Sequence, residues 1–580
     1  MKKLLLIALF LLSGHTAYGA TVYYADPNGS GSSCTQGTPC TFTQCTSTAT
    51  TGDTCSLNAG TYDLGSSGVN LTKNITYTST GSACSAIITS TNTTRTMGLN
   101  PANNSTPLIV QNVSINGDSA QNVVQIGDQA FDAEAQITGN CITNGGTIRH
   151  IADFWTRGTV KITNNTLTGT IGSAGAIYTS VTPSGSGKKQ VITGNTITAT
   201  MSQNSAIPAI YVGRVVASTI PFWGYVASNT LNITAPSSLG SSASIYGIRI
   251  DRIATGTSIN GDIQPMIVEY NTVTVTATGG TVNDTDAIMA SASESQATSY
   301  GVIIRNNTVT CNSPVTRCIS VGADASTPSF IDSARVYNNK VYGTYYNGSA
   351  TPHGISCGSV NDCQVYSNYV QGSSASILSG VGTNAKIFSN IINGGVYAGL
   401  LAKGNISATF ANNLVVMDDS ILGAKIGNYG CIGVASQGAT NTIATTFVNN
   451  TCFVNSKSST AWKFTQVDPS QTATFLTNNY FAVPTLTTTF SHQGTGYATV
   501  DDWNALANVE GETNVNPNIR GGQTPPVTAN LEQFKFGYST INSNGTVLRS
   551  FPYDFRGRSF GSNPTRGAFQ YGYRDFTSRN

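Results

Sequence analysis

The chain has 580 residues, a net charge of +2 and only 10% charged residues. Globular domains average about 25% charged residues, so this composition offers no basic surface of the kind that binds nucleic acid. The length exceeds what one compact core usually needs. Abundant Gly, Ser, Thr and Asn, together with Val and Ile, favour strands and turns over helices.

The N-terminus has the pattern of a secretory signal peptide over residues 1–20. Lys2 and Lys3 precede the apolar run Leu4–Leu12, and the small residues Ala17 and Gly19 fit a cleavage site. The apolar run is too short to span a bilayer. We therefore expect Sec-type export, a secreted or cell-surface location, and no membrane insertion after signal cleavage.

Twelve cysteines lie beyond this segment. An even number of cysteines in an oxidising compartment predicts disulfides. No histidine lies at ligand spacing from them, so a zinc site is not favoured. Three pairs are close in sequence and are candidates to bridge a single turn or two strands of one coil: Cys311–Cys318, Cys357–Cys363 and Cys431–Cys452.

A short motif recurs along most of the chain, as in "ARVYNNKVYG" at 334–343. It consists of an apolar residue, two variable residues, an asparagine, one further residue and another apolar residue. A repeat with a minimum length near 22 residues and variable excess is typical of a solenoid, and the β-branched alternation predicts short strands. The aligned asparagines are Asn112, Asn140, Asn165, Asn195, Asn229, Asn271, Asn307, Asn339, Asn368, Asn390, Asn413, Asn450 and Asn479.

The repeated asparagine is predicted to be structural. Side chains alternate faces along a strand, so the apolar residues three before and two after the asparagine should both face the interior. With coils stacked at about 4.8 Å, each asparagine would lie over the previous one at a bend between two strands. A ladder of side-chain amides would then satisfy buried polar groups that cost about 1–3 kcal/mol each when unpaired.

This pattern resembles the right-handed parallel β-helix of the pectin-lyase-like superfamily over about residues 21–485. The segments "VYYADPNGSGSS" and "GDTCSLNAGTYDL" resemble the N-terminal coil of such secreted proteins, and "FPYDFRGRSFGSNPTRGAFQYG" resembles their closing segment. The resemblance implies an all-β solenoid of about thirteen coils. We expect a cysteine-rich N-terminal cap and first coils at 21–105, the β-helix at 106–485, and a C-terminal region at 486–580 with a short helix at "DDWNALANV".

A second strand recurs in each coil, as in "AGAIYTS", "IYGIRID" and "PHGISCG". With its central apolar residue taken as inward, the residue one after it faces outward because side chains alternate, and the residue two before it is also assigned to the outer face. The longest repeat intervals lie between about residues 205 and 320, where long loops are expected to form the walls of a cleft. The predicted outward residues are Tyr178, Tyr211, Tyr246, Arg249, Asp286, Arg317 and His353, with Asp251 on the same face and Arg252 at the strand end.

Lyases of this superfamily cut acidic polysaccharides by β-elimination, using a cation near the uronate carboxylate and a base that is often Arg or Lys. The resemblance therefore implies a catalytic role for Arg249, Asp286, Arg317 and His353. A base role for arginine needs unusual surroundings, because a guanidinium is almost always protonated in water. Asp251 and Asp284 are candidate ligands of Ca2+, which prefers carboxylate oxygens, and no other cofactor is expected.

A glycosidase is the second enzymatic hypothesis. "PHGISCGS" resembles the "GHGISIGS" segment of polygalacturonase-like enzymes, with His353 at the functional histidine. The paired aspartates of that pattern do not precede it, since Asp418 and Asp419 come later in the chain. Glycosidases need two carboxylates at a set separation, and the rest of their pattern is missing here.

Aromatic residues supply the candidate substrate-binding surface, because their flat faces suit sugar rings. Tyr337, Tyr366 and Phe388 lie two before successive asparagines, with Arg335 and Lys386 beside them. The alternative is an aromatic ladder that only stabilises the sheet. The full set of predicted binding residues is Tyr178, Tyr211, Tyr246, Arg252, Tyr337, Tyr366 and Phe388.

Two functions remain open on the sequence alone. The first is a secreted protein that binds, and by β-elimination cleaves, an acidic polysaccharide or cell-surface glycan. The second is a non-catalytic surface or matrix protein that uses the rod as a spacer or adhesin. They differ in whether Arg249, Asp286, Arg317 and His353 converge on one pocket or lie in separate ion pairs. The oligomeric state does not follow from the sequence.

Overall fold

The computed structural model describes most of the chain between residues 20 and 510. The described residues are 20–102, 105–117, 121–127, 132–144, 149–154, 158–172, 175–181, 189–202, 206–214, 223–235, 244–251, 266–277, 284–291, 301–312, 317–322, 333–343, 353–358, 360–380, 382–404, 407–418, 430–436, 442, 444–455, 464–483, 490–510, 519–520 and 535–536. The predicted signal peptide, Arg252 and Asp419 lie outside them, as does most of the predicted closing region.

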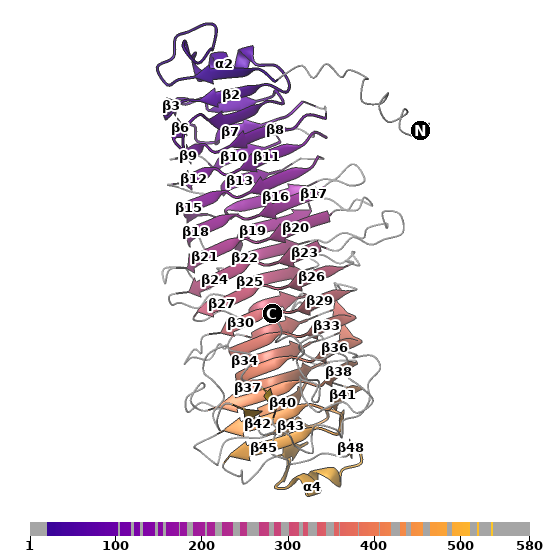
Figure 1. Cartoon of the computed structure of the whole chain (residues 1–580). Coiled ribbons are helices and arrows are strands. Elements are labelled where there is room, and N and C mark those ends of the chain that lie inside the picture. Colours follow the sequence, from indigo (N-terminus) through magenta and orange to yellow (C-terminus); the bar gives the residue numbers. More distant parts are fainter. Residues whose placement is uncertain are drawn as a thin grey trace, which may run out of the picture.

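One strand of each coil belongs to a 17-stranded parallel sheet, here called ladder I. Each strand pairs with the equivalent strand of the next coil, so the sheet runs along the whole rod (Figure 1). Its strands are β1 (Val22–Ala25), β2 (Thr54–Leu57), β5 (Thr76–Ser79), β8 (Leu108–Gln111), β11 (Ala135–Thr138), β14 (Val160–Thr163), β17 (Lys189–Thr193), β20 (Trp223–Ala227), β23 (Met266–Glu269), β26 (Val302–Arg305), β29 (Ala334–Tyr337), β33 (Cys363–Tyr366), β36 (Ala385–Phe388), β38 (Ala408–Ala411), β41 (Thr445–Val448), β44 (Ala473–Leu476) and β48 (Val509–Glu510).

The other strands form a 29-stranded sheet that consists of two parallel runs. Ladder II follows the asparagine turn and contains β3 (Gly60–Asp63), β6 (Ala86–Ser90), β9 (Ser114–Gly117), β12 (Cys141–Asn144), β15 (Thr166–Ile171), β18 (Thr196–Met201), β21 (Thr230–Ala235), β24 (Thr272–Ala277), β27 (Thr308–Asn312), β30 (Lys340–Gly343), β39 (Leu414–Asp418), β42 (Thr451–Asn455) and β45 (Asn479–Val483). Two long strands, β34 (Tyr369–Ser379) and β37 (Ile391–Lys403), belong to both runs.

Ladder III completes each coil. Its strands are β4 (Val69–Leu71), β7 (Arg95–Leu99), β10 (Asn122–Ile126), β13 (Arg149–Asp153), β16 (Ile177–Val181), β19 (Ala206–Arg214), β22 (Ser244–Asp251), β25 (Asp284–Ser291), β28 (Arg317–Val321), β31 (His353–Cys357), β40 (Gly430–Ala435), β43 (Thr465–Val467) and β46 (Phe490–His492). β46 also pairs antiparallel with β47 (Thr495–Tyr497). Smaller pairs are β32 (Val360–Asn361) with β35 (Gly382–Thr383), and β49 (Ile519–Arg520) with β50 (Lys535–Phe536).

The architecture is a right-handed parallel β-helix, as predicted. Parallel strands of one sheet joined by crossovers take this hand in nearly all proteins. Within residues 106–485 ladder I has thirteen strands, β8 to β44, which agrees with the predicted number of coils. Parallel pairing already begins at β1. The division of the chain near residues 105 and 485 remains a prediction.

Both ends of the stack are closed by a short helix (Figure 1). At one end α2 (Phe42–Thr48) places the buried Phe42 against Tyr62 and Tyr77. At the other end α4 (Val500–Asn504) buries Trp503 completely against Phe475. The predicted helix at "DDWNALANV" is therefore present, although shorter. These caps keep water from the apolar ends of the coils, where repeats need a protected outer face.

The asparagine ladder forms as predicted, with a correction at each end. Asn165 Oδ1 accepts hydrogen bonds of 3.0 Å from the backbone N–H and Nδ2 of Asn140 in the previous coil. The same contacts repeat along the rod to Asn450 and Asn478. In the first and last predicted repeats the assignment was wrong by one residue. Asn112 occupies the preceding turn position, with φ of 59°, and Asn478 rather than Asn479 occupies the ladder.

All twelve cysteines form disulfides in this structure. The three predicted pairs are confirmed: Cys311–Cys318, Cys357–Cys363 and Cys431–Cys452. Three more lie in the N-terminal third: Cys34–Cys40, Cys45–Cys55 and Cys84–Cys141. Among the helices of the described residues, none has the length and apolarity needed to cross a bilayer.

Candidate functional site

The predicted catalytic residues lie on the outer side of ladder III. Asp286 on β25, Arg317 on β28 and His353 on β31 occupy the same register position of successive coils. Tyr246 on β22 precedes them in this row. Arg249 lies three residues after Tyr246, in a second row that continues Tyr178 and Tyr211. The four predicted residues therefore lie on one face of ladder III, but in two rows.

The first row contains a buried ion pair. Arg317 Nε lies 2.9 Å from Asp286 Oδ1, and the two side chains are 5% and 0% exposed. His353 lies beside Arg317 in register and is partly buried. The structure thus joins Asp286 to Arg317 directly. Their catalytic roles remain a prediction.

The second row contains a separate ion pair. Arg249 Nη2 lies 2.7 Å from Asp251 Oδ2, and Ser291 donates a 2.6 Å hydrogen bond to the other carboxylate oxygen. The guanidinium also lies over the Tyr246 ring at 4.8 Å. Burial is the largest single influence and acts to lower the pKa of Arg249, but the Asp251 carboxylate together with Tyr246 and Tyr211 outweighs it, and the pKa is raised. This arginine is held in its protonated form, which suits anion binding better than proton removal.

The predicted calcium ligands do not gather into a cluster in the described part of the chain. Asp251 is occupied by Arg249 and Ser291. For Asp284 the structure describes only the strand, not the side chain. No group of three or more His, Cys, Asp or Glu among the described residues is arranged to hold a metal ion. Calcium binding therefore remains a prediction.

Aromatic rings and a further arginine lie beside the second row toward the N-terminus. Tyr178 and Tyr211 stack at 4.8 Å with 10° between ring planes, and Phe154 leans on Tyr178 at 5.7 Å and 45°. The guanidinium of Arg149 lies 5.0 Å from the Phe154 ring centre and 4.8 Å from that of Tyr178. We call this surface the aromatic–arginine face; it comprises Arg149, Phe154, Tyr178, Tyr211, Tyr246 and Arg249.

Arg149 was missed in the sequence analysis and is the unusual cation of this face. Its Nη1 donates a 3.2 Å hydrogen bond to Asn122, while its Nε is buried without a hydrogen-bond partner. No carboxylate of the described residues pairs with it. Burial lowers the pKa of Arg149, and the only opposing influence is Tyr178. The charge is thus partly desolvated, and no residue in the described part of the chain places an opposite charge beside it.

The predicted aromatic stripe on ladder I is a closed stack. Tyr337 and Tyr366 stack at 4.8 Å and 5°, and Tyr366 and Phe388 at 4.9 Å and 9°. Beyond Tyr337 lies Arg305, which donates a 2.8 Å hydrogen bond to the tyrosine hydroxyl and pairs with Glu269. The ring faces contact one another along the rod, so they are not available to sugar rings. This geometry favours the stabilising ladder that the sequence left open.

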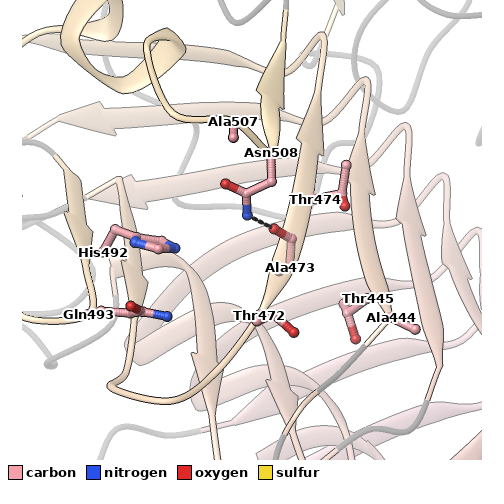
Figure 2. A pocket seen from close by; sticks show the side chains of 9 residues that line it. All are labelled: Ala444, Thr445, Thr472, Ala473, Thr474, His492, Gln493, Ala507 and Asn508. Carbon is pink, nitrogen blue, oxygen red and sulfur yellow. Dashed lines mark hydrogen bonds between the residues drawn. The ribbon is translucent and has the colours of Figure 1, made fainter.

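A pocket lies at the C-terminal end of the rod, far along the chain from the predicted site (Figure 2). Its volume is about 390 Å³, and it lies between β41, β44, the end of β46 and the segment before β48. Its polar lining residues are Thr445, Thr472, Thr474, His492, Gln493 and Asn508. The pocket joins four separate segments that no local motif links.

Comparison with known proteins gives fold-level matches and nothing closer. No protein-family model and no curated protein matches the chain. Among solved structures, the mannuronan C-5 epimerase AlgE6 A-module of Azotobacter vinelandii shares 13% identity over 80% of this chain and 91% of its own, with a TM-score of 0.25.

Two further solved structures match at a similar level. Pectate lyase Pel9A shares 12% identity over 95% of this chain and 97% of its own, with a TM-score of 0.23. SacteLam55A from Streptomyces sp. SirexAA-E shares 11% identity over 83% and 96%, with a TM-score of 0.20. The fold assigned above rests on the strand pairing of this chain itself.

Proposed function

We propose that this chain is an exported β-helix protein that binds an acidic polysaccharide on its aromatic–arginine face. The observation that carries the proposal is the guanidinium of Arg149, which is half-buried and has no carboxylate partner among the described residues. Its Nε is buried and has no hydrogen-bond partner. A sugar carboxylate would supply the missing charge and accept hydrogen bonds from the terminal nitrogens of the guanidinium, since the buried Nε is out of its reach. Six disulfides support an oxidising, extracytoplasmic location.

The tyrosines beside Arg149 fit the same ligand. Because Tyr178 and Tyr211 stack along the rod, their edges and hydroxyl groups, rather than their ring faces, are directed toward a ligand. Phenolic hydroxyls both donate and accept hydrogen bonds, as sugar hydroxyls require. Coils repeat at about 4.8 Å, so Arg149, Tyr178, Tyr211 and Arg249 would present a polar contact at each step along an extended chain.

Binding is better supported than cleavage. Arg249 and Arg317 each contact a carboxylate, in two separate ion pairs, and a guanidinium held this way resists losing its proton. β-Elimination through Asp286, Arg317 and His353 is the enzymatic alternative. A purely structural or adhesive role is the second alternative. Like binding, it involves no catalysis.

The test is binding of the purified mature protein to polygalacturonate and alginate, with dextran as the uncharged comparator. We expect affinity for the acidic polymers that falls with added salt. Arg149→Gln should weaken it by about ten- to a hundredfold, the equivalent of one charged hydrogen-bonding contact, and Tyr211→Phe by several-fold. Arg335→Gln, an exposed cation on ladder I, is the matched control and should bind like the wild type.

Two results would overturn the proposal. One is equal affinity for dextran and the acidic polymers, and the other is the same loss in Arg335→Gln as in Arg149→Gln. The same samples test cleavage, with and without Ca2+. An ultraviolet absorbance from an unsaturated product, abolished by Arg317→Ala or Arg249→Ala, would establish a lyase. New reducing ends without that absorbance would indicate a hydrolase.

A further inference from the structure

The pocket at the C-terminal end of the rod has fixed walls (Figure 2). Asn508 Nδ2 donates a hydrogen bond to the carbonyl of Ala473 on β44. Gln493 Nε2 donates a 3.2 Å hydrogen bond to the carbonyl of Gln471. His492 lies with its ring edge-on to the fully buried Trp503 of α4. The polar groups that face the cavity are therefore held in place before any ligand arrives.

These same residues leave hydrogen-bonding groups unused. The carbonyl oxygens of Asn508 and Gln493 make no hydrogen bond within the described part of the chain, and neither ring nitrogen of His492 does. The hydroxyl of Thr445 is buried and has no partner. Thr472 and Thr474 add two further hydroxyls to the lining. Of these groups only the Thr445 hydroxyl is fully buried, and a buried polar group is normally paired. The others are half-buried or exposed around it and offer both donors and acceptors to a ligand.

The described lining carries no charged side chain. Burial lowers the pKa of His492, so near pH 7 the ring is neutral and offers one donor and one acceptor. A carboxylate or phosphate ligand would lose its hydration without meeting an opposite charge. A cavity of about 390 Å³ lies at the small end of the usual range for ligand sites.

We propose that this pocket binds one or two units of an uncharged sugar. The neutral hydroxyl, amide and imidazole groups match the alternating donors and acceptors of a polyhydroxylated ring. The site is independent of the aromatic–arginine face, which lies on ladder III and carries positive charge. The two sites would therefore differ in the charge of the sugar that they select.

Two alanines provide matched variants for the test. Ala507 lines the pocket and is exposed, whereas Ala505, two residues earlier and also exposed, does not line it. Ala507→Trp should fill the cavity, and Ala505→Trp adds the same side chain outside it. Because both positions are on the surface, neither change should alter the thermal unfolding temperature by more than a few degrees.

The probes are cellobiose, maltose and mannobiose, with glucuronate as the charged comparator. Binding is measured by ligand-observed NMR and by calorimetry. We expect at least one neutral disaccharide to bind the wild type and Ala505→Trp alike, and Ala507→Trp to abolish its binding. His492→Phe keeps the ring but removes its hydrogen bonds and should weaken binding by about tenfold. Binding to acidic polymers should not change in Ala507→Trp.

Three outcomes would overturn this inference. They are binding that survives Ala507→Trp, no binding by any neutral probe, and preferential binding of glucuronate that Ala507→Trp abolishes. Loss of acidic-polymer binding in Arg149→Gln with intact disaccharide binding would support both proposals separately. Loss of both activities in Ala507→Trp, at unchanged stability, would contradict the independence of the two sites.

Discussion

Ladder I and the aromatic–arginine face both carry an arginine beside aromatic rings, but they differ in whether that arginine has a carboxylate partner within the protein. On ladder I, Arg305 Nη1 donates to the Tyr337 hydroxyl and its Nε contacts Glu269, which also accepts a 2.6 Å hydrogen bond from Tyr225. These hydrogen bonds, first to Tyr337 and then to Glu269, raise the pKa of Arg305. The network satisfies its own charges.

On the aromatic–arginine face, Arg149 also lies against aromatic rings, but among the described residues only the side-chain oxygen of Asn122 accepts one of its hydrogen bonds. Arg305 has a carboxylate partner, Glu269, whereas no described residue gives Arg149 one. Aromatic residues and arginine on one strand face therefore do not by themselves indicate a binding surface. What decides is whether the guanidinium already has an opposite charge within the protein.

The largest expected effect is on stability, and it comes from leaving a second arginine of ladder III, Arg317, without a carboxylate partner as Arg149 is. Arg317 and Asp286 form a buried pair, so Asp286→Asn should lower the free energy of unfolding by about 3–5 kcal/mol. Chemical denaturation measures it through the shift of the midpoint. The double variant Asp286→Leu with Arg317→Met should recover much of the loss, because it removes both charges together. An unchanged midpoint in Asp286→Asn would mean that Arg317 tolerates isolation as Arg149 does.

The second prediction concerns the interior directly behind Arg149. His150 is fully buried, its Nε2 lies 2.8 Å from the carbonyl of Thr168, and burial lowers its pKa to about 4. In the unfolded chain its pKa is about 6.5, so protonation favours unfolding. Stability should be full above pH 6.5 and should fall as the pH drops from 6.5 to 4, by about 3 kcal/mol in total.

Denaturation midpoints at pH 7 and pH 4.5 test this prediction. His150→Gln should flatten the dependence between these two values, whereas His492→Gln, on the partly exposed ring of the pocket, should leave most of it. If His150→Gln retains the wild-type slope, the acid sensitivity belongs to other groups. The prediction that His150, in the coil that carries Arg149, causes the loss of stability at low pH would then fail.

The fold could be predicted from the sequence because one residue position repeats with one physical role. Each ladder asparagine bonds the next through its side-chain amide, and the apolar residues on either side, such as Val226 and Leu231, are completely buried. The error at Asn112 has a physical cause, whereas at the other end the turn residue is Thr477 and Asn479 follows the ladder residue. The turn residue before the ladder has positive φ in coil after coil, as at Asn306 and Asn338, and asparagine tolerates that conformation. Two adjacent positions therefore favour the same residue.

The candidate sites were harder to predict because they depend on which side chains meet across coils. The rule that selected Asp286 and Arg317, two residues before an inward apolar residue, also selects Arg149 before Ile151, but it does not reveal whether a carboxylate lies within reach. The pocket is harder still to predict, since it brings together residues from 444 to 508 at the point where the repeat ends. Ends of solenoids lack the periodicity on which such reasoning depends.

The smallest expected effect is a gain in polymer affinity on ladder I when the carboxylate partner of Arg305 is removed. Glu269→Gln removes the carboxylate beside Arg305 but keeps an oxygen that can accept from Tyr225. Because Arg305 is 33% exposed, the loss of stability should be no more than about 1 kcal/mol. Ladder I would then carry an arginine without a carboxylate beside aromatic rings, as the aromatic–arginine face does. We expect a gain of about two- to threefold in affinity for polygalacturonate at low salt, measured by calorimetry in an Arg149→Gln background.

The control is Glu510→Gln, which removes the same charge from an exposed carboxylate at the end of ladder I, away from Arg305. An equal gain in that control would mean that net charge alone attracts the polymer, and the comparison between the two faces would lose its basis.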